Sequence, residues 1–156
     1  MYKANFNQFS EKTIKEINEV FRVAHTDGRG MLYEYEVYGI LKQIGLEVPK
    51  YVLVENPCEV DDKTLQMFGS KIVVKIVSPQ IAHKQKLGGV KIINNSDPLF
   101  VQFVLSRMME DVLSHFQVGE KPEIKGFLLT EFIPHTQALG YEVLIGFKED
   151  PAFGPV

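Results

Sequence analysis

The feature that most constrains the fold is the run Lys71–Val77, which reads KIVVKIV. It is rich in β-branched residues and is bounded by Gly-Ser and Ser-Pro dipeptides, a pattern that predicts a β-strand. Side chains alternate along a strand, so Ile72, Val74 and Ile76 are expected on one face. That apolar face must be covered by another layer of structure, which predicts a folded domain built around this strand.

The opposite face of the same run carries Lys75, which is the first candidate functional residue. An ammonium group in the middle of an apolar strand costs free energy unless it reaches water or an anion. The structural alternative is an edge strand, where a lysine extends to solvent and prevents aggregation. The next segment favours a functional role, because a basic loop with Lys84 and Lys86 leads to the pair Gly88-Gly89. Paired glycines often form only a hairpin turn, but they also let backbone N–H groups approach phosphate oxygens.

Three further residues are candidates, each with a structural alternative. His83 lies in the basic loop and is either a surface residue or a proton carrier or phosphoryl acceptor, because neutral imidazole is nucleophilic. Glu131 lies near the end of a predicted strand and is either an edge carboxylate or an ionic partner of Lys75. The break at Pro134 would leave hinge backbone groups free to hydrogen-bond an adenine edge. Glu142 is either solvent-facing or an acceptor for ribose hydroxyls.

The pattern along the chain predicts an α+β (mixed α/β) fold. Two helices come first, the second from about Glu34 to a C-cap at Gly45, and a β-α-β-β-α-β order follows. Strands are expected over 51–54, 71–77, 90–93, 127–133 and 141–148, a short helix from about 61 and a long helix over 98–116. A boundary is expected near 134–140.

Composition excludes several classes of protein. The formal net charge is −3, with 17 Lys and Arg against 20 Asp and Glu, so no nucleic-acid or anionic-membrane partner is expected. Cys58 is the only cysteine, which excludes an internal disulfide and fits a reducing compartment. No apolar run is long enough to span a bilayer and no signal peptide is visible, so a cytoplasmic location is expected.

Several motifs in a fixed order resemble the ATP-grasp part of ADP-forming acyl-CoA synthetases, including acetate–CoA ligases, and more distantly the succinyl-CoA synthetase β subunit. The motifs lie at 28–36 (GRGMLYEYE), 44–49 (IGLEVP), 73–90 (VVKIVSP to HK and GGV), 126–134 (GFLLTEFIP), and 140–146 (GYEVLIG) with 150–155 (DPAFGP). The resemblance implies a helical N-terminal segment at 1–49, a first ATP-grasp lobe at 50–134 and the beginning of a second lobe at 135–156. One departure is that Gln85 and Lys86 stand where the family usually has a small hydroxyl and an acidic residue.

The resemblance also implies roles for single residues. Lys75 would contact the nucleotide phosphates, with Gly88 and Gly89 in the loop that covers them. Glu131 and the backbone of Phe132 and Ile133 would meet the adenine, and Glu142 would contact the ribose. His83 matches the histidine proposed in this family to carry a phosphoryl group.

The implied cofactors are ATP or ADP and Mg²⁺, with the metal ligands expected beyond residue 156, so the isolated chain is expected to be inactive. The implied partner is the CoA-binding domain or subunit of the same enzyme. Two other interpretations stay open. One is a regulatory nucleotide-binding region fused to a protein lysine acetyltransferase, and the other is a non-catalytic module that docks a partner subunit.

Overall fold

The computed structural model describes residues 9–136, 149–150 and 154–155 of the chain. The helices are α1 (Glu11–Thr26), α2 (Glu34–Gln43), α3 (Asp62–Leu65) and α4 (Pro98–Ser114), with short 3-10 helices η1 (Pro57–Glu59) and η2 (Lys84–Leu87). The strands are β1 (Tyr51–Val54), β2 (Lys71–Val77), β3 (Val90–Asn94), β4 (Gly126–Glu131), β5 (Glu149–Asp150) and β6 (Gly154–Pro155). The predicted strand 141–148, with Glu142, lies outside the described residues.

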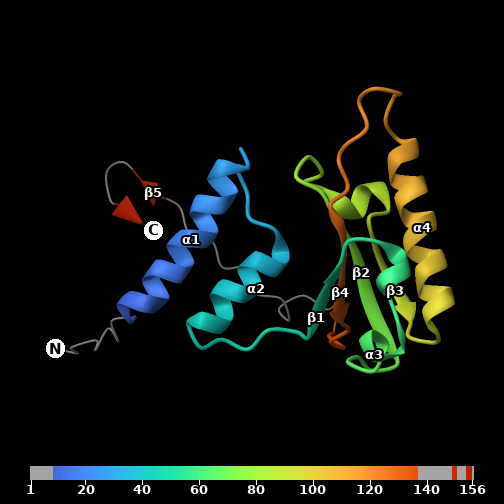
Figure 1. Cartoon of the computed structure of the whole chain (residues 1–156), viewed down its shortest axis with the longest axis horizontal. Coiled ribbons are helices and arrows are strands. Elements are labelled where there is room, and N and C mark those ends of the chain that lie inside the picture. The colour runs from blue at the N-terminus through green and yellow to red at the C-terminus, as the bar shows by residue number, and fades with distance from the viewer. Residues whose placement is uncertain (1–8, 137–148, 151–153, 156) are drawn as a thin grey trace.

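Strands β1 to β4 form one antiparallel sheet in the order β1-β4-β2-β3 (Figure 1). β2 therefore has a hydrogen-bonded neighbour on each side, with Lys75 in register with Val90 of β3 and Leu128 of β4. This position excludes the edge-strand explanation for Lys75, because an edge strand has a hydrogen-bonded neighbour on one side only and β2 has one on both sides. The antiparallel sheet and the packed helices confirm the predicted α+β class.

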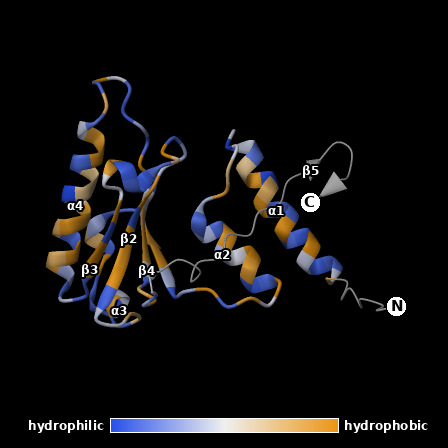
Figure 2. Ribbon diagram, turned by 180° about the vertical axis from the view of Figure 1, so that it is seen from behind, coloured by the Kyte–Doolittle hydropathy of each residue, from blue (hydrophilic) through white to orange (hydrophobic). Residues whose placement is uncertain are grey.

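Helix α4 covers one face of the sheet, and α1 and α2 lie on the side away from α4 (Figure 1). The core between α4 and the sheet contains fully buried residues from the strands and from the inner stripe of the helix: Ile72, Val74, Ile76, Phe127, Leu129, Val101, Leu105, Met108 and Val112. The hydropathy colouring shows hydrophobic residues along the central strands and along part of α4 (Figure 2). The predicted alternation of β2 is confirmed, because every second residue faces this core.

The helix ends follow local sequence signals. The side chains of Ser10, Asp61 and Asp97 each accept a backbone N–H three residues later, at 3.1, 2.7 and 2.9 Å, and so cap α1, α3 and α4. At the end of α2, Gly45 adopts φ 85°, and the N–H of Leu46 donates to the Leu41 carbonyl at 2.9 Å. This is the glycine-terminated end that the sequence predicts, because glycine reaches positive φ without steric cost.

The Asp97 cap provides a first test of the fold. We expect Asp97→Ala to lower the free energy of unfolding by about 1 kcal/mol, because the N–H of Phe100 loses its acceptor. Urea unfolding followed by circular dichroism measures the change. Asp97→Asn retains a side-chain oxygen and should remain close to the unaltered protein; an equal loss in both variants would contradict a capping role.

Two predicted boundaries differ from the structure. β4 ends at Glu131 rather than at Ile133, because β1 and β2 provide partners only as far as Thr130 and Glu131. The segment before the paired glycines contains η2, where an irregular loop was expected. No helix among the described residues is long and apolar enough to cross a membrane.

Candidate functional site

Lys75 projects from the sheet face opposite the α4 core, towards the start of α2. Its ammonium group forms an ion pair with the carboxylate of Glu34, the first residue of α2. The Lys75 side chain is only 20% exposed and that of Glu34 only 30%. Such partial burial makes the pair electrostatically stronger than a fully hydrated surface pair.

Tyr38 donates to the same Glu34 oxygen that pairs with Lys75. Its hydroxyl lies 2.5 Å from that oxygen, one helical turn along α2. Its ring lies 5.1 Å from the ring of Tyr51 on β1, which fixes α2 against the sheet. Burial, together with the hydrogen bond to Glu34, raises the pKa of the Tyr38 hydroxyl above its ordinary value. Tyr38 therefore stays a neutral donor and positions the carboxylate towards Lys75.

Lys84 brings a second cation to the same place. Burial lowers the pKa of Lys84, and the nearby positive charge of Lys75 lowers it further, while Glu34 acts in the opposite direction. Lys84 and Glu34 also line one cavity of about 220 Å³, between the start of α2 and the segment Ser78–Lys84. Its other lining residues are Met31, Leu32, Tyr33, Ser78, Pro79, Ile81 and Ala82. Glu34 and Lys84 thus lie at this cavity, and Lys75 lies directly behind Glu34 through their ion pair.

The basic loop is compact. His83 is exposed and precedes η2. Gly88 has φ 73°, and its N–H donates to the Gln85 carbonyl at 3.2 Å. The N–H of Gly89 donates to the Lys84 carbonyl at 2.8 Å, and the Gly89 carbonyl accepts from Ile76 at 2.9 Å. Because both glycine amides are hydrogen-bonded within the loop, direct contact with phosphate through these groups requires the loop to rearrange.

The predicted hinge lies at the other end of β4. The suggested ion pair between Glu131 and Lys75 is wrong, because Glu131 is in register with Ile72 and so faces the opposite side of the sheet. The Glu131 carboxylate instead accepts the backbone N–H of Lys50 at 3.1 Å. Phe132 follows directly, with the Lys71 ammonium 5.8 Å from its ring centroid, and Ile133 is exposed.

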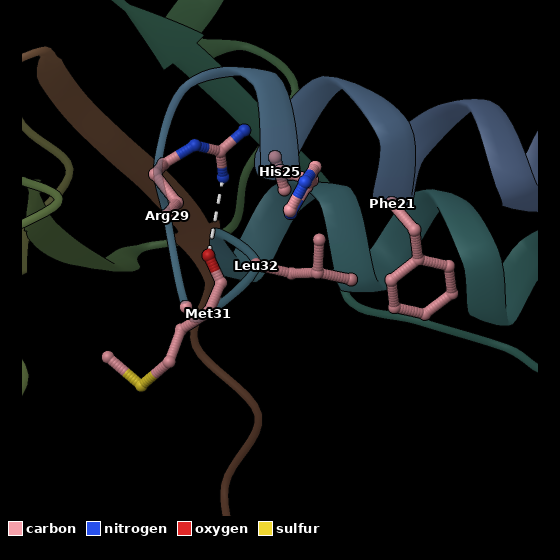
Figure 3. A pocket seen from close by; sticks show the side chains of 7 residues that line it. Phe21, His25, Arg29, Met31 and Leu32 are labelled. Atoms are coloured by element: carbon pink, nitrogen blue, oxygen red, sulfur yellow. Dashed lines mark hydrogen bonds between the residues drawn. The ribbon is translucent and has the colours of Figure 1, made fainter.

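Arg29 links α1 to α2 behind the site. Its guanidinium donates twice to Glu36, both at 2.8 Å, and also to Asp27, and its side chain is 6% exposed. The hydrogen bonds to Glu36 raise the pKa of Arg29, although burial opposes this shift. Arg29 also donates to the Met31 carbonyl at 3.4 Å, the contact drawn as a dashed line in Figure 3. Both residues line a cavity of about 310 Å³. Arg29 is fully paired and Phe21, Met31 and Leu32 are among the lining residues, so no ligand is assigned to this cavity.

The structure therefore brings together Lys75, Lys84 and the paired glycines, and it separates them from Glu131. Glu34 and Tyr38 were not predicted as site residues. Glu34 is 41 positions from Lys75, and the only signal was its place in the motif at 28–36. A contact of this kind depends on how α2 docks on the sheet, which local periodicity does not reveal.

Comparison with known proteins identifies the class. The family model of the ATP-grasp domain matches residues 23–156, and the chain belongs to this family. It is 35% identical over 138 residues to a 4-hydroxybutyrate–CoA ligase (ADP-forming) of Nitrosopumilus maritimus, with 88% of this chain and 18% of the relative covered. It is 33% identical to the β subunit of an ADP-forming acetate–CoA ligase I of Pyrococcus furiosus, with 91% and 57% covered.

Solved structures agree with this assignment. The chain resembles the dinucleotide-forming acetyl-coenzyme A synthetase 1 of Ca. Korarchaeum cryptofilum in two complexes. With coenzyme A and Ca-AMPCP, the TM-score is 0.69 at 29% identity, covering 88% of this chain and 56% of that one. With acetyl-coenzyme A and a phosphorylated phosphohistidine segment, the TM-score is 0.70 at 31% identity, covering 89% and 56%. This chain thus spans between 18% and 57% of the length of these relatives.

Proposed function

We propose that this chain is the phosphate-binding part of the nucleotide site in an ADP-forming acyl-CoA synthetase. The whole enzyme would interconvert acyl-CoA, ADP and phosphate with the free acid, CoA and ATP. The observation that carries the proposal is the partly buried Lys75 ammonium on a central strand, beside Lys84 and a cavity, in a chain of the ATP-grasp family. A cationic pair of this kind is suited to the adjacent charges of a nucleotide's phosphates.

Within this proposal, Lys75 and Lys84 bind the phosphates, and Gly88 and Gly89 shape the loop that presents Lys84 and His83. The backbone from Glu131 to Ile133 meets the adenine, and Glu142 the ribose. Lys75 is paired with Leu128 of β4, and Glu131 lies three residues further along that strand. At about 3.4 Å per residue, the hinge therefore lies about 10 Å from Lys75 along the sheet. The Korarchaeum relative was solved with a nucleotide analogue and with a phosphorylated phosphohistidine segment, which supports a nucleotide site in this family.

His83 is proposed as the residue that carries the phosphoryl group. Its exposure at the start of η2 leaves the ring accessible to a reacting phosphate. An imidazole nitrogen would take the phosphoryl group from the acyl phosphate formed on the CoA-binding domain or subunit, releasing the acid. ADP would then accept that group, giving ATP and restoring the free imidazole.

A bound Mg²⁺ would neutralise charge on the transferring phosphate. Within the described residues, no group of three or more His, Cys, Asp or Glu side chains is arranged to hold a metal ion. The residues proposed to bind phosphate in this chain are Lys75 and Lys84. We propose Mg²⁺ as a component of the whole enzyme.

The test is ADP binding by the chain with Lys75→Met, measured by isothermal titration calorimetry. We expect affinity to fall by at least about tenfold, which is about 1.4 kcal/mol, because a charge-assisted phosphate contact is lost. Lys63→Met is the matched control, since it removes the same charge from α3, which precedes the first residue of β2 and lies away from Lys75 in the sequence. Equal affinities in all three proteins would contradict the proposal and favour a docking module without a nucleotide site.

A further inference from the structure

Lys75, Lys84 and Glu34 lie together beside the cavity, and a phosphate-binding site does not require the carboxylate of Glu34. Lys75 already has an anionic partner, Glu34, and in the described part of the chain this is its only ion pair. Glu34 also lines the cavity together with Lys84. The carboxylate thus contacts both the Lys75 ammonium and the cavity, so a phosphate that enters from the cavity meets Glu34 beside Lys75.

A phosphate and Glu34 compete for the same ammonium. A nucleotide phosphate placed on Lys75 would bring several negative oxygens next to the Glu34 carboxylate. Like charges in a partly buried place repel more strongly than in bulk water, because the surroundings screen them less. Either the carboxylate moves away or the phosphate binds more weakly, so Glu34 must oppose nucleotide binding.

Glu34 also belongs to the first turn of α2, so its release has a structural consequence. Two carboxylates hold this turn: Glu34 binds the sheet through Lys75, and Glu36 binds Arg29 at 2.8 Å. Tyr38 also packs against Tyr51 of β1, with ring centroids 5.1 Å apart, a contact that the Glu34 carboxylate does not form. Loss of the Glu34 contact would therefore loosen the first turn from the sheet while the helix remains docked further along.

We propose that Glu34 is the resident counter-ion of Lys75, displaced by nucleotide phosphate, and that it couples nucleotide binding to the docking of the first turn of α2. This inference rests on the proposed function, because it assumes that Lys75 binds phosphate. It assigns Glu34 a regulatory role: the carboxylate keeps the lysine oriented in the empty site and limits affinity for nucleotide.

The test compares ADP affinities by calorimetry. We expect Glu34→Gln to bind ADP about fivefold more tightly than the unaltered chain, because the competing charge is removed while the size of the side chain is kept. Glu47→Gln is the matched control: it removes the same charge from an exposed residue after α2 and should change affinity less than twofold. In Glu34→Gln/Lys75→Met the gain should disappear.

Each outcome separates this inference from the proposed function. If Lys75→Met weakens ADP binding but Glu34→Gln binds ADP as the unaltered chain does, or more weakly, the counter-ion role is wrong and the phosphate site stands. If the unaltered chain does not bind ADP, or Lys75→Met binds as well as it does, the proposed function fails and this inference fails with it.

A second variant and a second measurement protect the test against misfolding. Tyr38→Phe removes only the hydroxyl that positions Glu34, and should give a smaller gain of about twofold. Hydrogen exchange of the unaltered chain should show faster exchange at Val37 and Tyr38 when ADP is added. Unchanged or slower exchange there, with ADP bound, would overturn the proposed coupling.

Discussion

Replacing Gly126 with alanine is expected to lower the free energy of unfolding by about 3 kcal/mol. Gly126 begins β4 with φ 145°, and a Cβ built there would lie 2.3 Å from the carbonyl oxygen of Val54 on β1. The obstacle is backbone in the neighbouring strand, so no side-chain rotation relieves it. Overpacking and strained φ each cost about 1–3 kcal/mol. Urea unfolding measures the loss, and amide exchange should show that β1 opens first.

Substitutions at two other glycines distinguish the backbone clash from the strained φ as causes of the loss at Gly126. Gly119 has φ 100° but no atom within 4 Å of a built Cβ, so Gly119→Ala reports the backbone strain alone, about 1 kcal/mol. Gly39 lies inside α2 with free space and no positive φ, so Gly39→Ala should stabilise the chain by up to about 1 kcal/mol. If Gly126→Ala costs no more than Gly119→Ala, the close approach of β1 to β4 is not as described.

The second large effect is expected from Arg29→Met. The substitution leaves the Glu36 carboxylate, whose side chain is only 12% exposed, without its bidentate partner. Removing one member of a buried ion pair typically costs about 3–5 kcal/mol, because the remaining charge stays desolvated. We expect a loss of about 3 kcal/mol in the helical segment, measured by urea unfolding with circular dichroism.

Arg22 is the matched control for Arg29. It also pairs with a glutamate, Glu19, at 2.5 Å, but its side chain is 64% exposed. Water solvates the exposed Glu19 carboxylate that remains, so Arg22→Met should produce no measurable change. Arg29→Lys should fall between the two, since it keeps the charge without the planar fork that binds both carboxylate oxygens. Equal losses for Arg22→Met and Arg29→Met would show that the Arg29 pair does not hold α1 and α2 together.

Much of the fold was predictable because it depends on short-range chemistry. The alternation in Lys71–Val77 predicted which face of β2 would be buried, and Asp97-Pro98 predicted the start of α4. Gly45 predicted the end of α2. Each of these signals acts within a few residues, through side-chain alternation, capping or glycine's access to positive φ, so the chain displays them without tertiary contacts.

Site assembly was less predictable. The sequence indicated Lys75 as a functional lysine. The structure pairs Lys75 with Val90, the residue that follows Gly89, and so brings the paired glycines beside the lysine. The proposed partner Glu131 was wrong, because register places it opposite Ile72, on the other face. A one-residue difference in register exchanges the faces of a strand, and pattern alone does not establish how two distant strands align.

The sequence by itself therefore determined the elements, the buried face of β2 and the unusual lysine on its other face. Only the tertiary structure decided that β2 is central, that Glu34 rather than Glu131 neutralises Lys75, and that Lys84 and Glu34 line one cavity. The physical reason is range: capping and alternation are properties of neighbouring residues. An ion pair between residues 41 positions apart exists only after α2 and the sheet have packed together.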